Sequence, residues 1–328
     1  RGKPLVFRLL GDKQQAQETL EELYLLDNTN AFVAQEAKSL GIEGYVGLSN
    51  LITNELPSES YIALALKYHA AGRDEESISV LKRSPADAKI LLLLAYLDVP
   101  NREDWLEKAL NTSPDLVFPF RTEVYEALGE LTKLSDDWKL SYYMALILWK
   151  KELLEEAQTT MLKCGDRPDY APFYLAKAKL FAHDDAIVAD ALEKAKQIAP
   201  KDWRVQLALV DQLIGKKQYL EAAKIAKKVY DANPDNSLMG IRHASALLKS
   251  GKYKQTLSFL ERLVIIPFEG AFEGRGIYHE AAIRLAYESI QKSDFANAIS
   301  YVETAKLWPR NLGTGKPYNV DERLENSI

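Results

Sequence analysis

The sequence has little of what a disulfide-stapled, metal-bound or membrane-spanning protein needs. It contains one cysteine, Cys164, and four scattered histidines in 328 residues, which excludes an internal disulfide and a cysteine-rich metal site. The longest apolar run, Ile90 to Leu97, has eight residues, far fewer than the roughly 18–20 that cross a bilayer. No signal-peptide pattern opens the chain. We therefore expect no metal and no membrane span, and a cytoplasmic location is favoured although the compartment is not fixed.

One-sided charge is also missing. The 42 basic and 47 acidic residues nearly balance, so the chain as a whole has no attraction to nucleic acid or to an anionic membrane. Apolar residues make up 47% of the sequence, which is ample for a buried core. The first residues, RGKPLVFRLL, contain no initiator methionine. We expect this chain to be a piece of a longer protein.

What the sequence does have is a helical rhythm that repeats. Apolar residues recur at spacings of three and four and seldom alternate, and helices are expected to end near Pro234 and Pro309. A shift of 34 residues places Tyr219 on Tyr253, and the same shift in the other direction places Pro234 on Pro200. The pattern predicts helical hairpins that follow one another along the chain.

These units resemble the tetratricopeptide repeat, although the tryptophan typical of the fourth position is absent. The resemblance implies an all-α fold, a tetratricopeptide-like solenoid of helical hairpins wound as a right-handed superhelix. We expect divergent N-terminal helices or a cap at residues 1–57, repeats at 58–309 and a C-terminal tail at 310–328. The region 114–137 fits the repeat poorly and predicts one helix of an irregular unit.

Small and aromatic residues stand where such hairpins need them. Cys164 occupies a position of a small buried residue, which favours inert packing over a reactive thiol. Small side chains are expected where the first helix of a unit approaches the second, at Ala145, Ala176, Ala244 and Ala286. Aromatic side chains are expected to fill the gap at the turn, at Tyr219, Tyr253 and Phe295.

The rhythm stops in the stretch IIPFEGAFEGRGIYHEA. The turns expected near Gly251 and Ser293 are 42 residues apart, eight more than the 34-residue shift, which predicts a loop insertion at 268–277. Insertions in repeat arrays often lie on the binding face, but a long connection explains the length equally well. Contacts of Glu269, Arg275 and Tyr278 with the neighbouring helices would indicate a structural role, and free side chains would indicate a partner.

No motif predicts catalysis. The segment HEAAI, beginning at His279, lacks the second histidine of a zinc-protease helix, and GTGKPY lacks the flanking residues of a phosphate-binding loop. The loop glycines follow a helix, whereas a dinucleotide site follows a strand. We predict that the chain is not an enzyme, with no catalytic residue, no metal and no cofactor.

What remains is a surface for a protein or peptide. The resemblance implies that the first helices line a concave face, while the alternative that the aromatic rings only pack between helices stays open. The Lys/Asn clamp by which chaperone-binding members hold acidic tails is absent. The predicted partner-binding residues, from first helices and loop, are Tyr142, Trp149, Phe173, Lys177, Arg242, Tyr287, Glu269, Arg275 and Tyr278.

A narrower resemblance covers Val117 to the end. The segments DDWKLSYYMALILWKKELLEEA, CGDRPDYAPFYLAKA, EGAFEGRGIYHEA and LWPRNLGTGKPYNVDERLE are similar to the C-terminal repeat region of a large bacterial family. Its members carry an N-terminal domain of unknown function, a β-sandwich related to carbohydrate-handling domains. The resemblance implies a non-catalytic scaffold that binds a protein, a peptide or that missing domain. The alternative is the accessory half of a carbohydrate-active enzyme whose catalytic domain lies outside this chain.

Overall fold

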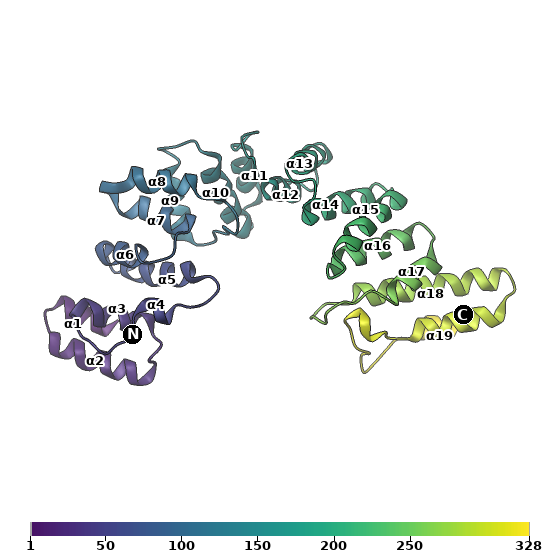
Figure 1. The fold of residues 1–328 in the computed structure, drawn as a ribbon, viewed down its shortest axis with the longest axis horizontal. Coiled ribbons are helices and arrows are strands. Elements are labelled where there is room, and N and C mark those ends of the chain that lie inside the picture. Colours follow the sequence, from purple (N-terminus) through teal and green to yellow (C-terminus); the bar gives the residue numbers. More distant parts are fainter. Residues whose placement is uncertain (1, 328) are drawn as a thin grey trace. The chain divides into compact units, whose positions relative to one another are not determined.

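The computed structural model describes residues 2–327, and every regular element in that range is a helix. The chain divides into two compact units, with the boundary between Pro168 and Asp169. Consecutive helices pair as antiparallel hairpins in both units (Figure 1). The chain is therefore an all-α array of tetratricopeptide-like helical hairpins, as the sequence predicted. The boundary between the units was not predicted.

Unit 1 begins with four N-terminal helices and continues with hairpins. Its elements are α1 (Lys3–Leu9), α2 (Lys13–Leu26), α3 (Ala31–Leu40), α4 (Leu48–Leu51), α5 (Pro57–Ala70), α6 (Asp74–Leu81), α7 (Ala88–Leu97), η1 (Val99–Asn101), α8 (Arg102–Asn111), α9 (Thr122–Leu131), α10 (Trp138–Lys150) and α11 (Leu154–Leu162).

Unit 2 contains four hairpins followed by a tail. Its elements are α12 (Ala171–Leu180), α13 (Asp185–Ile198), α14 (Trp203–Gly215), α15 (Tyr219–Ala232), α16 (Ser237–Lys249), α17 (Tyr253–Leu260), α18 (Glu273–Gln291), α19 (Phe295–Lys306), η2 (Arg310–Leu312) and α20 (Arg323–Ser327).

Local sequence explains where many of these helices begin. A short polar side chain before the first turn accepts hydrogen bonds from backbone N–H groups that have no partner inside the helix. Proline, which lacks an N–H, stands in the first turn of α1, α5 and α12. The capping side chains are Asp12, Asn30, Asp87, Asp137, Asp184, Asp202, Asn236 and Asp294.

The turns inside the hairpins lie where the repeat rhythm placed them. Gly251 follows α16 and Ser293 follows α18, and both adopt the left-handed backbone conformation, with φ of 77° and 59°. Glycine adopts this conformation without strain, whereas serine does so at a cost. The 42-residue interval between these turns is confirmed.

The region 114–137, for which the sequence predicted an irregular unit, contains one helix, α9. Residues 113–121 lead into it without regular structure. Helix α9 has no hairpin partner of its own and packs against both α7 and α10 (Figure 1). Its Val124, Ala127, Leu128 and Leu131 are buried.

Most small residues sit where close helix packing needs them. Ala145, Ala244 and Ala286 are fully buried, and Cys164 is buried with its Sγ 3.4 Å from the carbonyl oxygen of Trp138. These predictions are confirmed. Ala176 is only half-buried, whereas Ala178 of the same helix, α12, is buried.

The predicted aromatic filling of the turns is only partly right. Tyr219 and Tyr253 are half-buried, and Tyr253 packs against the core of α16–α19. Phe295 is 63% exposed, so the prediction is wrong for this residue. It is the first residue of α19, where the side chain lies at the rim of the hairpin and away from the core.

The N-terminal helices of unit 1 are fixed by a buried charge network. Arg8 of α1 donates from Nε to Glu36 of α3 at 2.9 Å, and the hydroxyl of Tyr68 on α5 donates to the same carboxylate at 2.7 Å. Glu76 of α6 pairs with Arg8 at 3.3 Å and with Arg73 at 2.7 Å. Glu36 is fully buried. Burial raises the pKa of Tyr68, and the charge of Glu36 raises it further.

A second polar arrangement runs across successive first helices of unit 1. Glu59 of α5 accepts from Lys89 Nζ of α7 at 2.7 Å and from Arg121 Nε, before α9, at 3.2 Å. Lys89 is buried, and the carboxylates of Glu59 and of Asp87, which lies 3.8 Å away, compensate the loss of water around its ammonium group.

Candidate functional site: an apolar loop before α18

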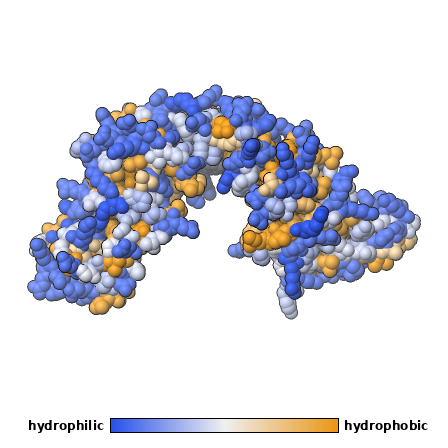
Figure 2. All heavy atoms as spheres, viewed as in Figure 1, coloured by the Kyte–Doolittle hydropathy of each residue, from blue (hydrophilic) through white to orange (hydrophobic). Residues whose placement is uncertain are grey.

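The connection between α17 and α18, residues 261–272, presents the least expected surface of unit 2. In its first half the chain is extended and its side chains alternate, with Leu263 and Ile265 buried and Val264 and Ile266 exposed. We call the four exposed apolar residues of this connection, which are 60% to 79% exposed, the apolar loop: Val264, Ile266, Phe268 and Phe272. Figure 2 shows hydrophobic side chains gathered where the chain enters α18.

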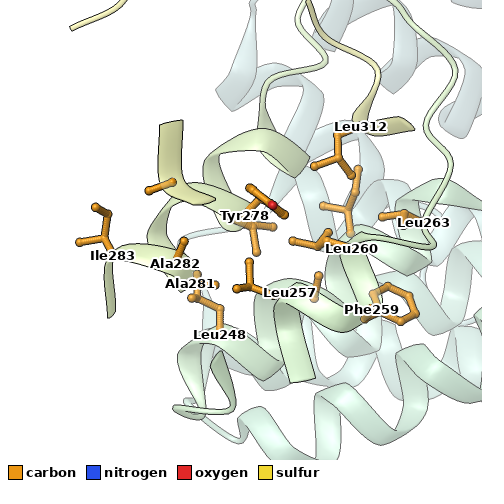
Figure 3. Close-up of a cluster of buried hydrophobic side chains, with 14 of the residues drawn as sticks. Leu248, Leu257, Phe259, Leu260, Leu263, Tyr278, Ala281, Ala282, Ile283 and Leu312 are labelled. Carbon is orange, nitrogen blue, oxygen red and sulfur yellow. The ribbon is translucent and has the colours of Figure 1, made fainter. Parts of the chain in front are cut away.

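The C-terminal tail fixes the backbone of this loop. The amide N–H of Ile265 donates to the carbonyl of Asn311 at 2.8 Å. The Asn311 side chain donates in return to the carbonyls of Leu260 and Leu263, at 2.8 and 2.7 Å. Leu312 is fully buried in the same cluster as Leu260 and Leu263 (Figure 3). The first half of the loop is thus tied to the tail at Leu263 and Ile265, and its outer side chains are left in solvent.

Two glycines make this close approach possible. A Cβ at Gly274 would lie 2.7 Å from Cδ1 of Ile265, and a Cβ at Gly313 would lie 2.8 Å from Cγ2 of the same residue. Both distances are shorter than atoms tolerate. Gly313 also has a φ of 76°, which a side chain would strain. The glycines of this region therefore serve packing between loop and tail.

The prediction of a loop at 268–277 is wrong in its second half. Helix α18 begins at Glu273, so Arg275 and Tyr278 are helical and both are buried. Arg275 Nη2 donates to the carbonyl of Ala305 at 2.6 Å, and its guanidinium lies 4.6 Å from the ring centroid of Trp308. Burial lowers the pKa of Arg275 and raises that of Tyr278. Tyr278 lies in the core cluster of α16–α19, and Arg275 reaches the last turn of α19.

Of the three loop residues whose contacts were to distinguish a structural role from partner binding, two are in contact with the fold and one is exposed. Arg275 and Tyr278 are tied into neighbouring helices and have a structural role. Glu269 is exposed beside Phe268. A further clamp closes the tail: Glu325 of α20, which is buried, lies 2.8 Å from Nε2 of His279. Only the outer half of the predicted loop remains available to a partner.

The predicted first-helix residues fall into two groups. Tyr142, Phe173 and Lys177 are buried. Their side chains shape the helix packing, which corrects the expectation that they contact a partner directly. Trp149 is half-buried, and Tyr287 is 55% exposed. The predicted residues lie on both units, and Arg242 and Tyr287 share unit 2 with the apolar loop.

Arg242 is accessible but already engaged. Its Nε lies 2.6 Å from Asp211 of α14, and its Nη1 lies 2.8 Å from Glu273 of α18. Arg242 therefore links three successive first helices. Burial opposes the charged form, but the two carboxylates outweigh it and raise the pKa of Arg242. Because Glu273 follows Phe272 in the chain, this ion pair lies at the edge of the apolar loop.

The sequence contained no readable signal for the residues that were missed. In LVIIPF, apolar residues alternate between buried and exposed positions, which is the pattern of an extended segment with one covered side. With every residue apolar, that alternation could not be read from polarity. The tail residues that cover one side lie about 50 positions away, as the Asn311–Leu260 contact shows.

The described part of the chain has neither a metal-binding cluster nor a membrane-spanning helix. Among residues 2–327, no group of three or more histidine, cysteine, aspartate or glutamate side chains is placed to hold a metal ion. In the same range no helix has the length and apolar character needed to cross a membrane.

Comparisons with known proteins give likeness of fold at low similarity. No protein-family model matches the chain, and no curated protein matches it. A tetratricopeptide repeat protein from Parabacteroides merdae is 12% identical, covers 82% of this chain and 96% of its own, and has a TM-score of 0.39. Yeast Tom70 is 14% identical, covers 92% of this chain and 83% of its own, and has a TM-score of 0.33.

Proposed function

We propose that this chain is a non-catalytic helical-repeat scaffold that binds a protein partner through the apolar loop. The observation that supports the proposal is the exposure of Val264, Ile266, Phe268 and Phe272 on a connection that the tail holds at Leu263 and Ile265. Contiguous exposed apolar surface in a folded protein marks an interaction site.

The fixed backbone favours binding over mere exposure. A flexible loop loses conformational entropy when a partner orders it, and a loop held by Asn311 and Leu312 has already lost it. Two phenylalanines supply large apolar side chains of a kind that is enriched at interfaces. The Arg242–Glu273 ion pair supplies a polar rim beside Phe272.

The partner class follows from the same chemistry. An apolar centre with a polar rim fits a protein or peptide surface, and neither nucleic acid nor membrane is proposed. Tyr287, exposed on α18, and Trp149, half-buried on α10, stay as further contact positions.

Selective capture tests the proposal. Immobilised wild-type chain is compared with I266S/F268S, and L25S/L26S is the matched control because Leu25 and Leu26 are exposed apolar residues of unit 1. We expect I266S/F268S to retain about tenfold less partner, since truncating an interface anchor costs more than 1 kcal/mol. The control should retain the wild-type amount.

Equal capture by the wild type and I266S/F268S would refute the apolar loop as the contact surface. All substituted side chains are exposed, so each variant should unfold within about 0.5 kcal/mol of the wild type. Thermal unfolding monitored by circular dichroism checks this point before capture is compared.

The larger setting is a finer proposal, supported by the resemblance of the tail segment LWPRNLGTGKPYNVDERLE to the bacterial family. In this form of the proposal the partner is an N-terminal domain of the same protein. The alternative is that the chain is the accessory half of a carbohydrate-active enzyme, with the apolar loop contacting its catalytic domain.

The enzymatic turnover of the longer protein distinguishes the scaffold from the accessory half of an enzyme. In the wild type and in I266S/F268S, unchanged turnover supports the scaffold, and reduced turnover supports the accessory role. Substitution is preferable to deletion of 268–278, because deletion would remove Arg275 and the start of α18.

A further inference from the structure

A groove separate from the apolar loop lies between two successive hairpins of unit 2. It has a volume of about 810 Å³. One wall is a single stripe of α14, and the other comes from the end of α12 and the first half of α13. The lining residues that the argument uses are Leu175, Val188, Leu207, Lys179, Arg204 and Lys216.

The floor of the groove is apolar and incompletely covered. Leu175, Val188 and Leu207 are each half-buried, although their chemistry suits full burial. On α14 only Val205 and Val210 are buried. The two hairpins thus leave between them apolar surface that neither covers.

The rim of the groove is positively charged. Lys179, Arg204 and Lys216 are exposed, and within residues 2–327 none of them lies within ion-pair distance of a carboxylate. Two acids also line the groove. Asp211 pairs at 2.6 Å with Arg242, which it shares with Glu273, and Asp185 is the second acid. The three cations outnumber these two acids, and Arg204 also lies 4.7 Å from the ring centroid of Trp203.

We propose that this groove binds an acidic amphipathic helix of a partner protein. The apolar stripe of such a helix would cover Leu175, Val188 and Leu207, and its carboxylates would face the three cations. A helix fits better than an extended segment, because helical walls offer few free backbone groups and a helix satisfies its own. The proposal does not depend on the apolar loop.

Two idealised peptides of about five helical turns test this directly. One carries leucines at helical spacing and glutamates elsewhere, and the other carries lysines in place of the glutamates. Fluorescence anisotropy of the labelled peptides measures binding to the full chain. We expect saturable binding of the acidic peptide, at least about tenfold weaker binding of the basic one, and weakening by salt.

Charge reversal locates the site. In K179E/R204E/K216E the acidic peptide should bind at least about tenfold more weakly. The matched control is K224E/K228E/K249E, which makes the same change of net charge with exposed lysines of α15 and α16 outside the groove. The control should bind like the wild type, and so should I266S/F268S.

Several results would overturn the proposal: no saturable binding, equal affinity for both peptides, or equal loss in both charge-reversed variants. Loss of peptide binding in I266S/F268S would place the peptide at the apolar loop. Light scattering that shows self-association abolished by K179E/R204E/K216E would make a second copy the occupant. Failure of partner capture through the apolar loop would leave these peptide measurements unaffected, so the two proposals fail independently.

Discussion

Different interactions hold the terminal helices at the two ends of the repeat array. At the N-terminal end, Arg8, Glu36 and Tyr68 join three helices through a buried carboxylate. At the C-terminal end, Leu312 and the neutral amide of Asn311 hold the tail against α17 and the loop. A buried charge network is specific but fragile, because removing one member leaves the others unpaired. An apolar contact is less specific, and the stability lost on truncating it increases with the volume of the cavity that is left.

The largest effect should come from breaking the N-terminal network. E36A removes the carboxylate that Arg8 and Tyr68 share, and we expect about 4 kcal/mol of lost stability in unit 1. E75A is the control, because Glu75 is exposed on α6. Urea unfolding gives the magnitude, and hydrogen exchange should show α1–α3 opening first. A loss as small as that of E75A would mean that apolar packing alone holds these helices.

The C-terminal end should respond somewhat less. L312A leaves a cavity among Leu260, Leu263 and Tyr278 and should cost about 3 kcal/mol. Exposed Leu307 supplies the control, L307A. Hydrogen exchange should increase at residues 261–272, because the tail no longer fixes the loop. Unchanged exchange there would show that the loop holds its conformation without the tail.

The contacts of Glu59 in unit 1 and of Arg242 in unit 2 allow a buried ion pair to be compared with an exposed one. E59Q leaves the buried Lys89 without its nearest carboxylate, and about 2 kcal/mol should be lost. E273Q removes an exposed partner of Arg242, which keeps Asp211, so less than about 0.5 kcal/mol should be lost. Urea unfolding of both variants measures the difference. Similar losses would show that burial of Lys89 does not set the strength of the pair.

The smallest effect is a difference in pH dependence. His243 of α16 is buried with Nδ1 2.9 Å from the carbonyl of Ala223, and burial lowers its pKa. Below about pH 6.5 the unfolded chain binds a proton that the folded chain does not, so unit 2 loses stability as pH falls through this range.

The N-terminal network should weaken only in stronger acid. Burial alone would raise the pKa of Glu76, but hydrogen bonds from Arg73 and Arg8 outweigh it and lower the pKa. Its contribution is complete above about pH 4.3 and is lost as pH falls through the lower folded-state value. Thermal unfolding measured across pH tests both predictions. H243N should remove the loss of stability near neutral pH, and E76Q should remove the loss in stronger acid. A single loss that both variants change alike would contradict the assignment.

How much of the site the sequence could predict depended on the range of each contact. The turns at Gly251 and Ser293 and the lone helix α9 were predictable, because helix periodicity and turn chemistry are local. The burial of Arg275 and Tyr278 was not, since Arg275 contacts Ala305 of α19 and Trp308 after it, and Tyr278 packs in the cluster that includes Ala305 and Leu312. The exposure of the apolar loop could not be predicted either, because the residues that cover its other side lie about 50 positions away.

The sequence by itself determined that this chain forms helical hairpins, how far apart their turns lie and most of the small residues that the helices enclose, Ala176 being the exception. These properties follow from periodicity, and periodicity survives the divergence of individual repeats. Only the tertiary structure decided which aromatic and charged side chains reach solvent. Phe173 and Phe268 look alike in the sequence, yet Phe173 is buried and Phe268 is exposed. Burial is a property of what packs against a side chain, and that partner can lie anywhere along the chain.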